Sequence, residues 1–149
     1  MEKLDLRKKF KHLYSPSHNK VQIVDVPEMN FLMIDGRGDP NTSKSYRDAV
    51  EALYNVAYDL KFAIRKEEGI DYPVMALEGL WWTDDMSIFR MENKEAWSWT
   101  MMIMQPEYVT EARLRATLQK LEVKKKPPSV KLGRLERYGE GLSAQIMQI

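Results

Sequence analysis

The sequence lacks cysteine altogether, and this absence excludes disulfides, thiolate metal sites and thiol nucleophiles. Histidine is almost as scarce, because only His12 and His18 are present and both lie in a polar stretch without neighbouring ligand residues. We therefore expect no bound metal. No pattern of serine, histidine and aspartate indicates a catalytic triad, and no glycine-rich motif has the spacing of a phosphate-binding loop, so we expect no cofactor.

The sequence also has no large excess of charge of either sign and no long apolar run. The 23 lysines and arginines nearly balance the 22 acidic residues, so the net charge of +1 gives no general attraction to nucleic acid or membranes. No segment reaches the roughly 18 apolar residues that span a bilayer, and the charged N-terminus has no signal-peptide core. We therefore expect a cytoplasmic protein with no direct nucleic-acid partner and no membrane partner.

The 149 residues are predicted to form a single domain of the α+β class, with helices covering one face of an antiparallel sheet. Apolar residues recur at helical spacing between residues 43 and 67, and a further helix is predicted over 110–122. Strands are predicted over 21–26, 30–35, 74–82 and 97–105, and two more flank a glycine-rich turn near the C-terminus. The other face of such a sheet can meet solvent, a partner or a ligand.

A carboxylate stands inside an apolar run in the segment MALEGLWW, residues 75–82. Alternation along a strand places Glu78 with Leu80 and Trp82 on one face, and Trp81 on the opposite face. Moving an unpaired carboxylate out of water costs on the order of several kcal/mol of free energy. Glu78 therefore needs solvent, a partner or a ligand.

Two interpretations of Glu78 remain open from the residues alone. In the first, Glu78 is the acid of an aromatic pocket in which Trp81, Trp82 and Trp99 hold a flat, hydrophobic cation, and the 10 methionines make the pocket adaptable. In the second, the tryptophans and methionines are ordinary core and Glu78 pairs with a basic residue at the sheet edge. Aromatic and methionine stripes are more often packing than ligand sites.

The predicted helix over 43–67 carries a second stripe of large side chains. Tyr54, Tyr58 and Phe62 are spaced by four residues and therefore share one face of the helix. They could form the wall of a ligand pocket above the sheet, with the tyrosine hydroxyls as hydrogen-bond donors. The alternative is ordinary packing of the helix with the hydroxyls in water.

Several longer motifs resemble those of the GyrI-like small-molecule-binding family, in its stand-alone branch. They are VDVPEMNFLMIDGRGDPNTSKSYRDAVEALYNVAYDLKF, ALEGLWW, WSWTMMIMQPEYVTEA and GEGLSAQIMQI, and together they extend over nearly the whole chain. The resemblance implies two strand-helix-strand-strand modules related by a pseudo-twofold axis, with a ligand between them. The first module would occupy about 20–106 and the second about 107–149.

The resemblance also implies a function. Relatives hold lipophilic cations with an acid and aromatic residues, resemble a DNA gyrase inhibitor, or hydrolyse the cyclopropane ring of DNA-alkylating natural products. These expectations favour Glu78 as the catalytic or binding acid, with Tyr54, Tyr58, Trp81, Trp82 and Trp99 as ligand-binding residues. The alternative function, from a different functional class, is a protein-interaction module of the gyrase-inhibitor type without catalysis.

The second module of this chain is incomplete by comparison with the family pattern. Family members usually continue past QIMQI with a Gly-Pro-Tyr segment, a second long helix and two more strands that carry another glutamate. The terminal segment LSAQIMQI is apolar on parts of both faces, and the elements that would cover it in the family are not encoded. Either the chain is a truncated product or a partner replaces the missing half. Exposed apolar edges pair with other chains, so we expect a homodimer.

Overall fold

The computed structural model describes residues 1–124 and 128–148, so Ile149, the last residue of the terminal segment, lies outside the described residues. Within this part of the chain no helix is both long and apolar enough to cross a lipid bilayer. The elements in chain order are β1 (Glu2–Lys3), α1 (Leu6–Lys9), α2 (Lys11–Tyr14), β2 (Gln22–Val26), β3 (Met29–Arg37), α3 (Lys44–Glu68), β4 (Ile70–Asp71), β5 (Leu77–Trp82), η1 (Met86–Ile88), η2 (Met91–Ala96), β6 (Ser98–Gln105), α4 (Glu111–Val123), η3 (Pro128–Leu132), β7 (Arg134–Tyr138) and β8 (Gly141–Gln145).

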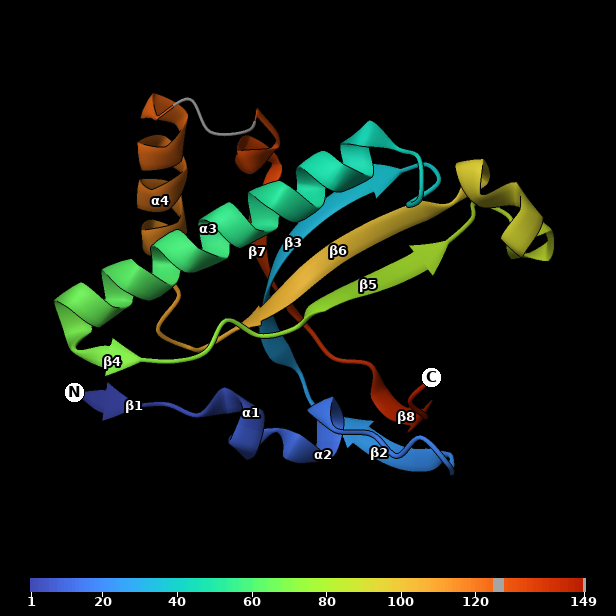
Figure 1. Ribbon diagram of the computed structural model, residues 1–149, viewed down its shortest axis with the longest axis horizontal. Coiled ribbons are helices and arrows are strands. Elements are labelled where there is room, and N and C mark those ends of the chain that lie inside the picture. The colour runs from blue at the N-terminus through green and yellow to red at the C-terminus, as the bar shows by residue number, and fades with distance from the viewer. Residues whose placement is uncertain (125–127, 149) are drawn as a thin grey trace.

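The centre of the fold is a four-stranded antiparallel sheet in the order β5-β6-β3-β7 (Figure 1). Three of its strands come from the segment predicted as the first module, and β7 comes from the segment predicted as the second. Two smaller pairs accompany the sheet: β1 with β4 in parallel, and β2 with β8 antiparallel. The structure confirms the predicted α+β class with an antiparallel sheet.

Helix α3 covers one face of this sheet because its apolar residues recur at helical spacing. The hydroxyl of Ser43 accepts a hydrogen bond from the backbone N–H of Tyr46 and caps the helix N-terminus. Gly69 ends the helix with a φ of 67°, a left-handed conformation that glycine adopts without a steric penalty. The buried residues of α3 are Ala49, Ala52, Leu53, Val56, Ala57, Leu60 and Ile64.

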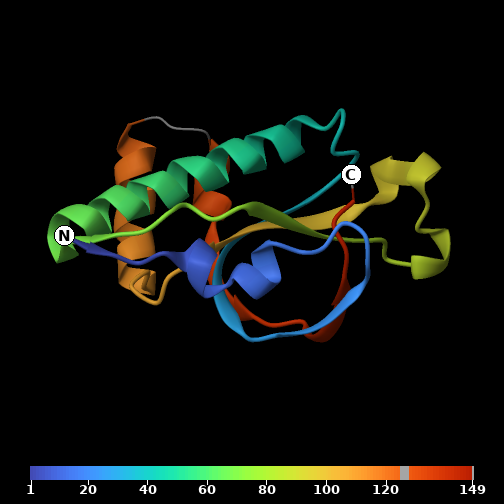
Figure 2. The ribbon, with the colours of Figure 1, turned by 60° about the horizontal axis from the view of Figure 1, so that its bottom comes forward.

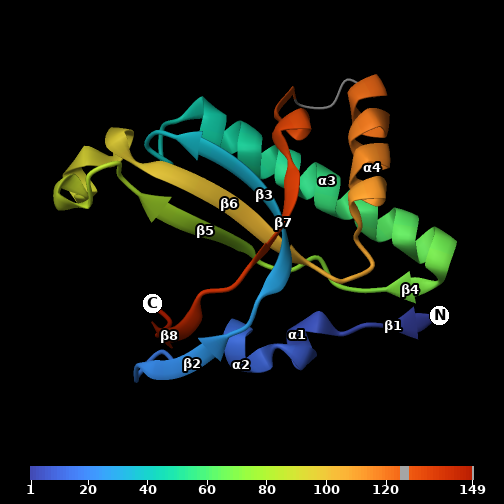
Figure 3. The same cartoon turned by 180° about the vertical axis from the view of Figure 1, so that it is seen from behind.

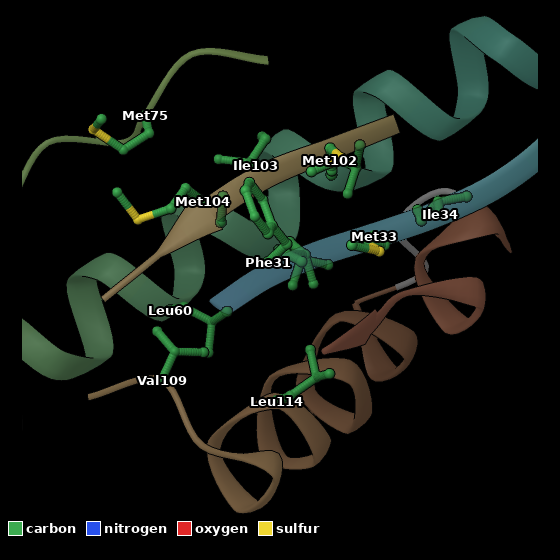
Figure 4. Packing of buried hydrophobic residues seen from close by; sticks show 14 of the residues in the cluster. Phe31, Met33, Ile34, Leu60, Met75, Met102, Ile103, Met104, Val109 and Leu114 are labelled. Atoms are coloured by element: carbon green, nitrogen blue, oxygen red, sulfur yellow. The ribbon is translucent and has the colours of Figure 1, made fainter. Parts of the chain in front are cut away.

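Helix α4 lies beside α3, and both are on the same side of the sheet (Figures 1 and 3). Asp59 of α3 links the two helices, since it accepts hydrogen bonds from the Thr117 hydroxyl at 2.9 Å and from the Lys120 ammonium at 2.9 Å. The buried cluster between sheet and helices includes Leu60 and Leu114 together with Ile103 of β6 (Figure 4).

The opposite face of the sheet is also largely buried, because the N-terminal segment packs across it. Leu6 is buried, and Phe10, Leu13 and Tyr14 of the two short helices pack against the same core as Met104. Figure 2 shows α1 and α2 in front of the sheet, on the side away from α3. Strand β6 is accordingly buried on both faces, as its mixed apolar sequence predicts.

Two strand predictions differ from the structure. The strand predicted over 74–82 begins only at Leu77, because the carbonyl oxygen of Val74 accepts a hydrogen bond from the Arg7 side chain instead of from a neighbouring strand. The two C-terminal strands do not pair with each other. The chain turns at Gly139 and Gly141, so that β7 extends the main sheet while β8 pairs with β2.

Candidate functional site

Glu78 lies on the sheet face opposite α3, where it meets the end of α2. The hydroxyl of Tyr14 donates a hydrogen bond to Oε2 of Glu78 at 2.7 Å. The register places Glu78 beside Met102 of β6, and Met102 beside Met33 of β3, so an apolar floor extends from the acid across the sheet. Both methionines are buried. The carboxylate therefore stands at the edge of a methionine-lined surface with one phenol as its partner.

The surroundings of Glu78 favour its protonated form. Burial is the largest influence and raises the pKa of Glu78 above its ordinary value, and the negative charge of Glu140 adds to this effect. The hydrogen bond from Tyr14 acts in the opposite direction, because it stabilises the carboxylate. Burial and the adjacent Glu78 carboxylate both raise the pKa of Tyr14, so its phenol stays protonated and remains a donor.

Local structure explains how Tyr14 reaches this position. Asp5 caps α1 by accepting a hydrogen bond from the backbone N–H of Lys8, and Phe10 separates α1 from α2 with a φ of −109° that interrupts regular helix. Leu6 and Phe10 anchor the segment on the core. The segment therefore forms two short helices, Leu6–Lys9 and Lys11–Tyr14, in place of one continuous helix.

The remaining polar groups on the Glu78 face form a network on β3, β6 and β7. Asp35 accepts a hydrogen bond from the Thr100 hydroxyl at 2.6 Å and pairs with Arg134 at 2.7 Å. Arg134 also pairs with Glu136 at 2.8 Å. No basic side chain of the described residues forms an ion pair with Glu78, so the expected structural partner at the sheet edge is replaced by the phenol of Tyr14.

The predicted tryptophans divide between the two faces. Trp82 shares the face of Glu78 and is 37% exposed. Trp81 and Trp99 are cross-strand partners on the α3 side, where their rings contact Tyr46 at centroid distances of 5.8 and 5.4 Å. Trp99 is fully buried. The structure therefore brings Trp82 to the face of Glu78, places Trp99 in the core, and packs the half-buried Trp81 against that core.

The tyrosine stripe of α3 does not line a pocket over the sheet. Tyr54, Tyr58 and Phe62 stack along the helix with centroid distances of 6.5 and 6.2 Å, and Tyr58 and Phe62 are 46% and 52% exposed. Tyr58 and Phe62 lie on the outer side of α3, away from the buried aliphatic stripe, whereas Tyr54 packs against the core. Tyr54 is half-buried, but it too is on the opposite side of the sheet from Glu78.

Tyr14 also lines a small cavity of about 140 Å³ together with Arg7, Ser15, Met75 and Ala76. This cavity adjoins the strand that carries Glu78 and has room for a few atoms beside the phenol. Among the described residues, no group of three or more histidine, cysteine, aspartate or glutamate side chains could hold a metal ion. The chemistry that the Glu78–Tyr14 pair offers is proton transfer by a carboxyl group whose pKa is raised.

Sequence reasoning missed Tyr14 because 64 positions separate it from Glu78. The available signal was the spacing of Phe10, Leu13 and Tyr14, which places three large side chains on one helical face in an otherwise charged segment. That spacing predicts docking of the segment on the core. It does not identify the strand on which the segment docks.

Comparison with known proteins identifies relatives among solved structures. No protein-family model and no curated protein matches the sequence. An uncharacterized conserved protein from Listeria innocua is 37% identical with a TM-score of 0.88, and the match covers 98% of this chain and 72% of that one. A hydrolase from Listeria innocua is 36% identical with a TM-score of 0.83, covering 98% and 73% of the two chains. A further structure described as a hydrolase from that organism is 36% identical with a TM-score of 0.86, covering 99% and 72%. With this identity over nearly its whole length, the chain belongs to the family of these Listeria innocua proteins.

Proposed function

We propose that the protein is a GyrI-like hydrolase that binds a flat, hydrophobic small molecule on the sheet face of Glu78. The observation that carries the proposal is the Glu78–Tyr14 pair, in which a carboxyl group with a raised pKa is held at 2.7 Å from a phenol beside buried methionines. Two relatives described as hydrolases support the reaction class. The finer proposal is hydrolysis of cyclopropane-containing genotoxins.

The properties of the site suit a planar, apolar substrate. Met33 and Met102 are buried beneath this face and make it deformable, and Trp82 offers a partly exposed indole on the same face. A single carboxylate in such surroundings also supplies the counter-charge for a cationic ring system. Selectivity would then come from the shape of the face and from this one charge.

The proposed reaction adds water to a cyclopropane conjugated with a carbonyl group. Glu78, as the carboxylate, accepts a proton from water while the water oxygen bonds to a ring carbon. The bond between that carbon and its ring neighbour breaks, and its electron pair moves to the conjugated carbonyl oxygen, which takes up a proton from solvent while Glu78 releases the proton it accepted. Tyr14 holds the carboxylate in position through its hydrogen bond. A raised pKa makes Glu78 a stronger base than an exposed glutamate and therefore a better proton acceptor near neutral pH.

The direct test follows hydrolysis of a carbonyl-conjugated cyclopropane by mass spectrometry. The wild-type protein should convert the compound into a product heavier by one water, and the added oxygen should derive from labelled water. Glu78→Gln should reduce the rate by at least about 100-fold, which is typical for loss of a general base. Glu51→Gln, an exposed substitution on α3 that changes the charge equally, should retain the rate. Equal rates in the two variants would contradict a catalytic role for Glu78.

Ligand binding can be tested independently of catalysis. A planar cationic dye on the Glu78 face should quench Trp82 fluorescence, and Trp82→Phe should remove most of that quenching. Glu78→Gln should weaken binding of the cationic dye by about tenfold, equivalent to ~1.4 kcal/mol, and leave a neutral dye of the same shape nearly unaffected. Equal losses for both dyes would show that Glu78 does not act through its charge.

A second candidate function is a protein-interaction module of the gyrase-inhibitor type. The exposed apolar side chains of the β2–β8 pair favour it, since Ile23 and Leu142 are 67% and 79% exposed. This function predicts binding to purified DNA gyrase that Leu142→Lys abolishes and Glu78→Gln preserves. If an excess of this protein changes neither the activity of gyrase nor its electrophoretic mobility, this candidate function is excluded.

A further inference from the structure

A second and larger cavity lies between the N-terminal segment and the region where α3 is followed by β4. Its volume is about 660 Å³, within the range of small-molecule sites. The parallel pairing of β1 with β4 brings the two walls together (Figures 1 and 3). We call it the basic cavity, and it is lined by Lys3, Leu4, Asp5, Arg7, Lys8, Lys11, Ser15, Lys61, Asp71, Tyr72 and Pro73.

The lining of the basic cavity carries an excess of positive charge, with five cationic side chains against two acidic ones. Both acids are already engaged. Asp71 pairs with Lys61 at 2.8 Å, and Asp5 caps α1. Within the described residues, the other four cations of the cavity have no carboxylate within ion-pair distance, although Arg7 donates to the carbonyl oxygen of Val74. The chain as a whole has a net charge of only +1, so this concentration is local.

We propose that the basic cavity binds a small organic molecule that carries two or more phosphate groups. Lysine ammonium groups act as mobile point charges and suit phosphate oxygens without demanding one fixed geometry. Several such groups around a concave space raise the local concentration of a polyanion far more than the same charges on a flat surface. A membrane surface suits the observations less well, because the apolar side chains of α1 and α2 pack on the core.

Occupation of the cavity would hold the N-terminal segment in place. Within the part of the chain that the structure describes, the four unpaired cations of the cavity all lie on the wall formed by that segment. The opposite wall carries Lys61 paired with Asp71, so a polyphosphate between the walls would neutralise the segment and hold it against α3 and β4. Arg7 and Ser15 also line the small cavity beside Tyr14. A bound polyphosphate would therefore reduce opening of residues 3–15, the segment that brings Tyr14 to Glu78.

Pyrophosphate is a suitable probe, and calorimetric titration at constant ionic strength measures its binding to the full chain. We expect one pyrophosphate per chain and binding at least tenfold weaker in the double variant Lys8→Gln/Lys11→Gln. The matched control is Lys20→Gln/Lys131→Gln, which removes two exposed lysines outside the cavity and should bind as the wild type does. Glu78→Gln should also bind pyrophosphate normally, so this proposal stands or falls separately from the proposed function.

Hydrogen exchange provides a second measurement that needs no variant. Pyrophosphate should slow amide exchange in residues 3–15 of the wild-type protein, whereas potassium chloride at the same ionic strength should not. Equal weakening in the two double variants, or equal protection by potassium chloride, would overturn the proposal. Binding to anionic phospholipid vesicles without binding of pyrophosphate would overturn it as well, since it would assign the charges to a membrane surface.

Discussion

The indole ring of Trp99 lies directly over Gly36, its cross-strand partner. A Cβ atom built on Gly36 would lie 2.1 Å from Cη2 of that ring, far inside contact distance. The glycine thus makes room for a ring that is 1% exposed and that contacts Tyr46 of α3 edge-on at 5.4 Å. This pair fixes the distance between the sheet and the first turns of α3.

Gly36→Ala should destabilise the fold by about 1–3 kcal/mol, because overpacking must displace a buried indole. Urea denaturation measures the change. In a Trp99→Leu background the same glycine substitution should cost much less, since the atoms it would strike are gone. An equal cost in both backgrounds would show that backbone preference, rather than the Trp99 ring, requires glycine here.

Tyr14→Phe should raise the pKa of Glu78 further, because the hydrogen bond it removes is the influence that lowers that pKa. Carboxyl ¹³C chemical shifts followed through a pH titration measure this change. Loss of the bond should also lower the free energy of unfolding by about 1.5 kcal/mol at neutral pH. Tyr58→Phe removes a hydroxyl from a side chain that is 46% exposed, and serves as the control with little effect on either quantity. An unchanged Glu78 titration would contradict the assigned contact.

The raised pKa of Glu78 also predicts how stability depends on pH. Between the pKa of Glu78 in the unfolded chain and its higher value in the fold, the native protein binds more protons, so its free energy of unfolding falls as pH rises. Glu78→Gln has no such group. The variant should therefore gain stability relative to the wild type as the pH rises above about 4, the ordinary pKa of a glutamate, until Glu78 is fully ionised in the fold; Glu51→Gln, at an exposed site, serves as the control. Parallel stability curves for wild type and Glu78→Gln would refute the shift.

The outer face of the β2–β8 pair should mediate a homodimer. Val21, Ile23 and Leu142 are 61%, 67% and 79% exposed, and together they form an apolar surface next to an open sheet edge. We expect sedimentation at micromolar concentration to give a dimer and Leu142→Lys to give a folded monomer. Leu132→Lys, at an exposed site in η3, should remain dimeric. A wild-type monomer with rapidly exchanging amides in β8 would rule this assembly out.

Periodicity predicted most of the fold because burial controls it directly. The stripe through Leu53, Val56 and Leu60 gave α3 to within one residue at each end, and alternation placed Glu78 and Trp81 on opposite faces, as their contacts with Tyr14 and Tyr46 confirm. These features depend on which side of an element is apolar. The apolar side of an element can be read from the spacing of neighbouring residues in the sequence.

Features that depend on contacts between distant segments were harder to predict. Nothing in the sequence near Val74 shows that Arg7 binds its carbonyl oxygen, so that the strand begins only at Leu77. The same holds for β8, whose partner is β2 rather than the adjacent β7. For the site, alternation identified the acid and its face, but an aromatic composition could not show that Trp99 packs on Gly36 while Trp82 remains half in solvent.

The pairing of β2 with β8 joins segments from opposite ends of the chain, with Gln22 beside Gln145. During synthesis β2 leaves the ribosome long before its partner is made, so its hydrogen-bonding edge stays open until β8 has emerged. Long-range pairs of this kind also slow refolding, because loop closure must precede the contacts that stabilise it. Nascent chains that have not reached Gly141 would therefore expose the β2 edge, and this edge is where a chaperone would bind them or where they would aggregate.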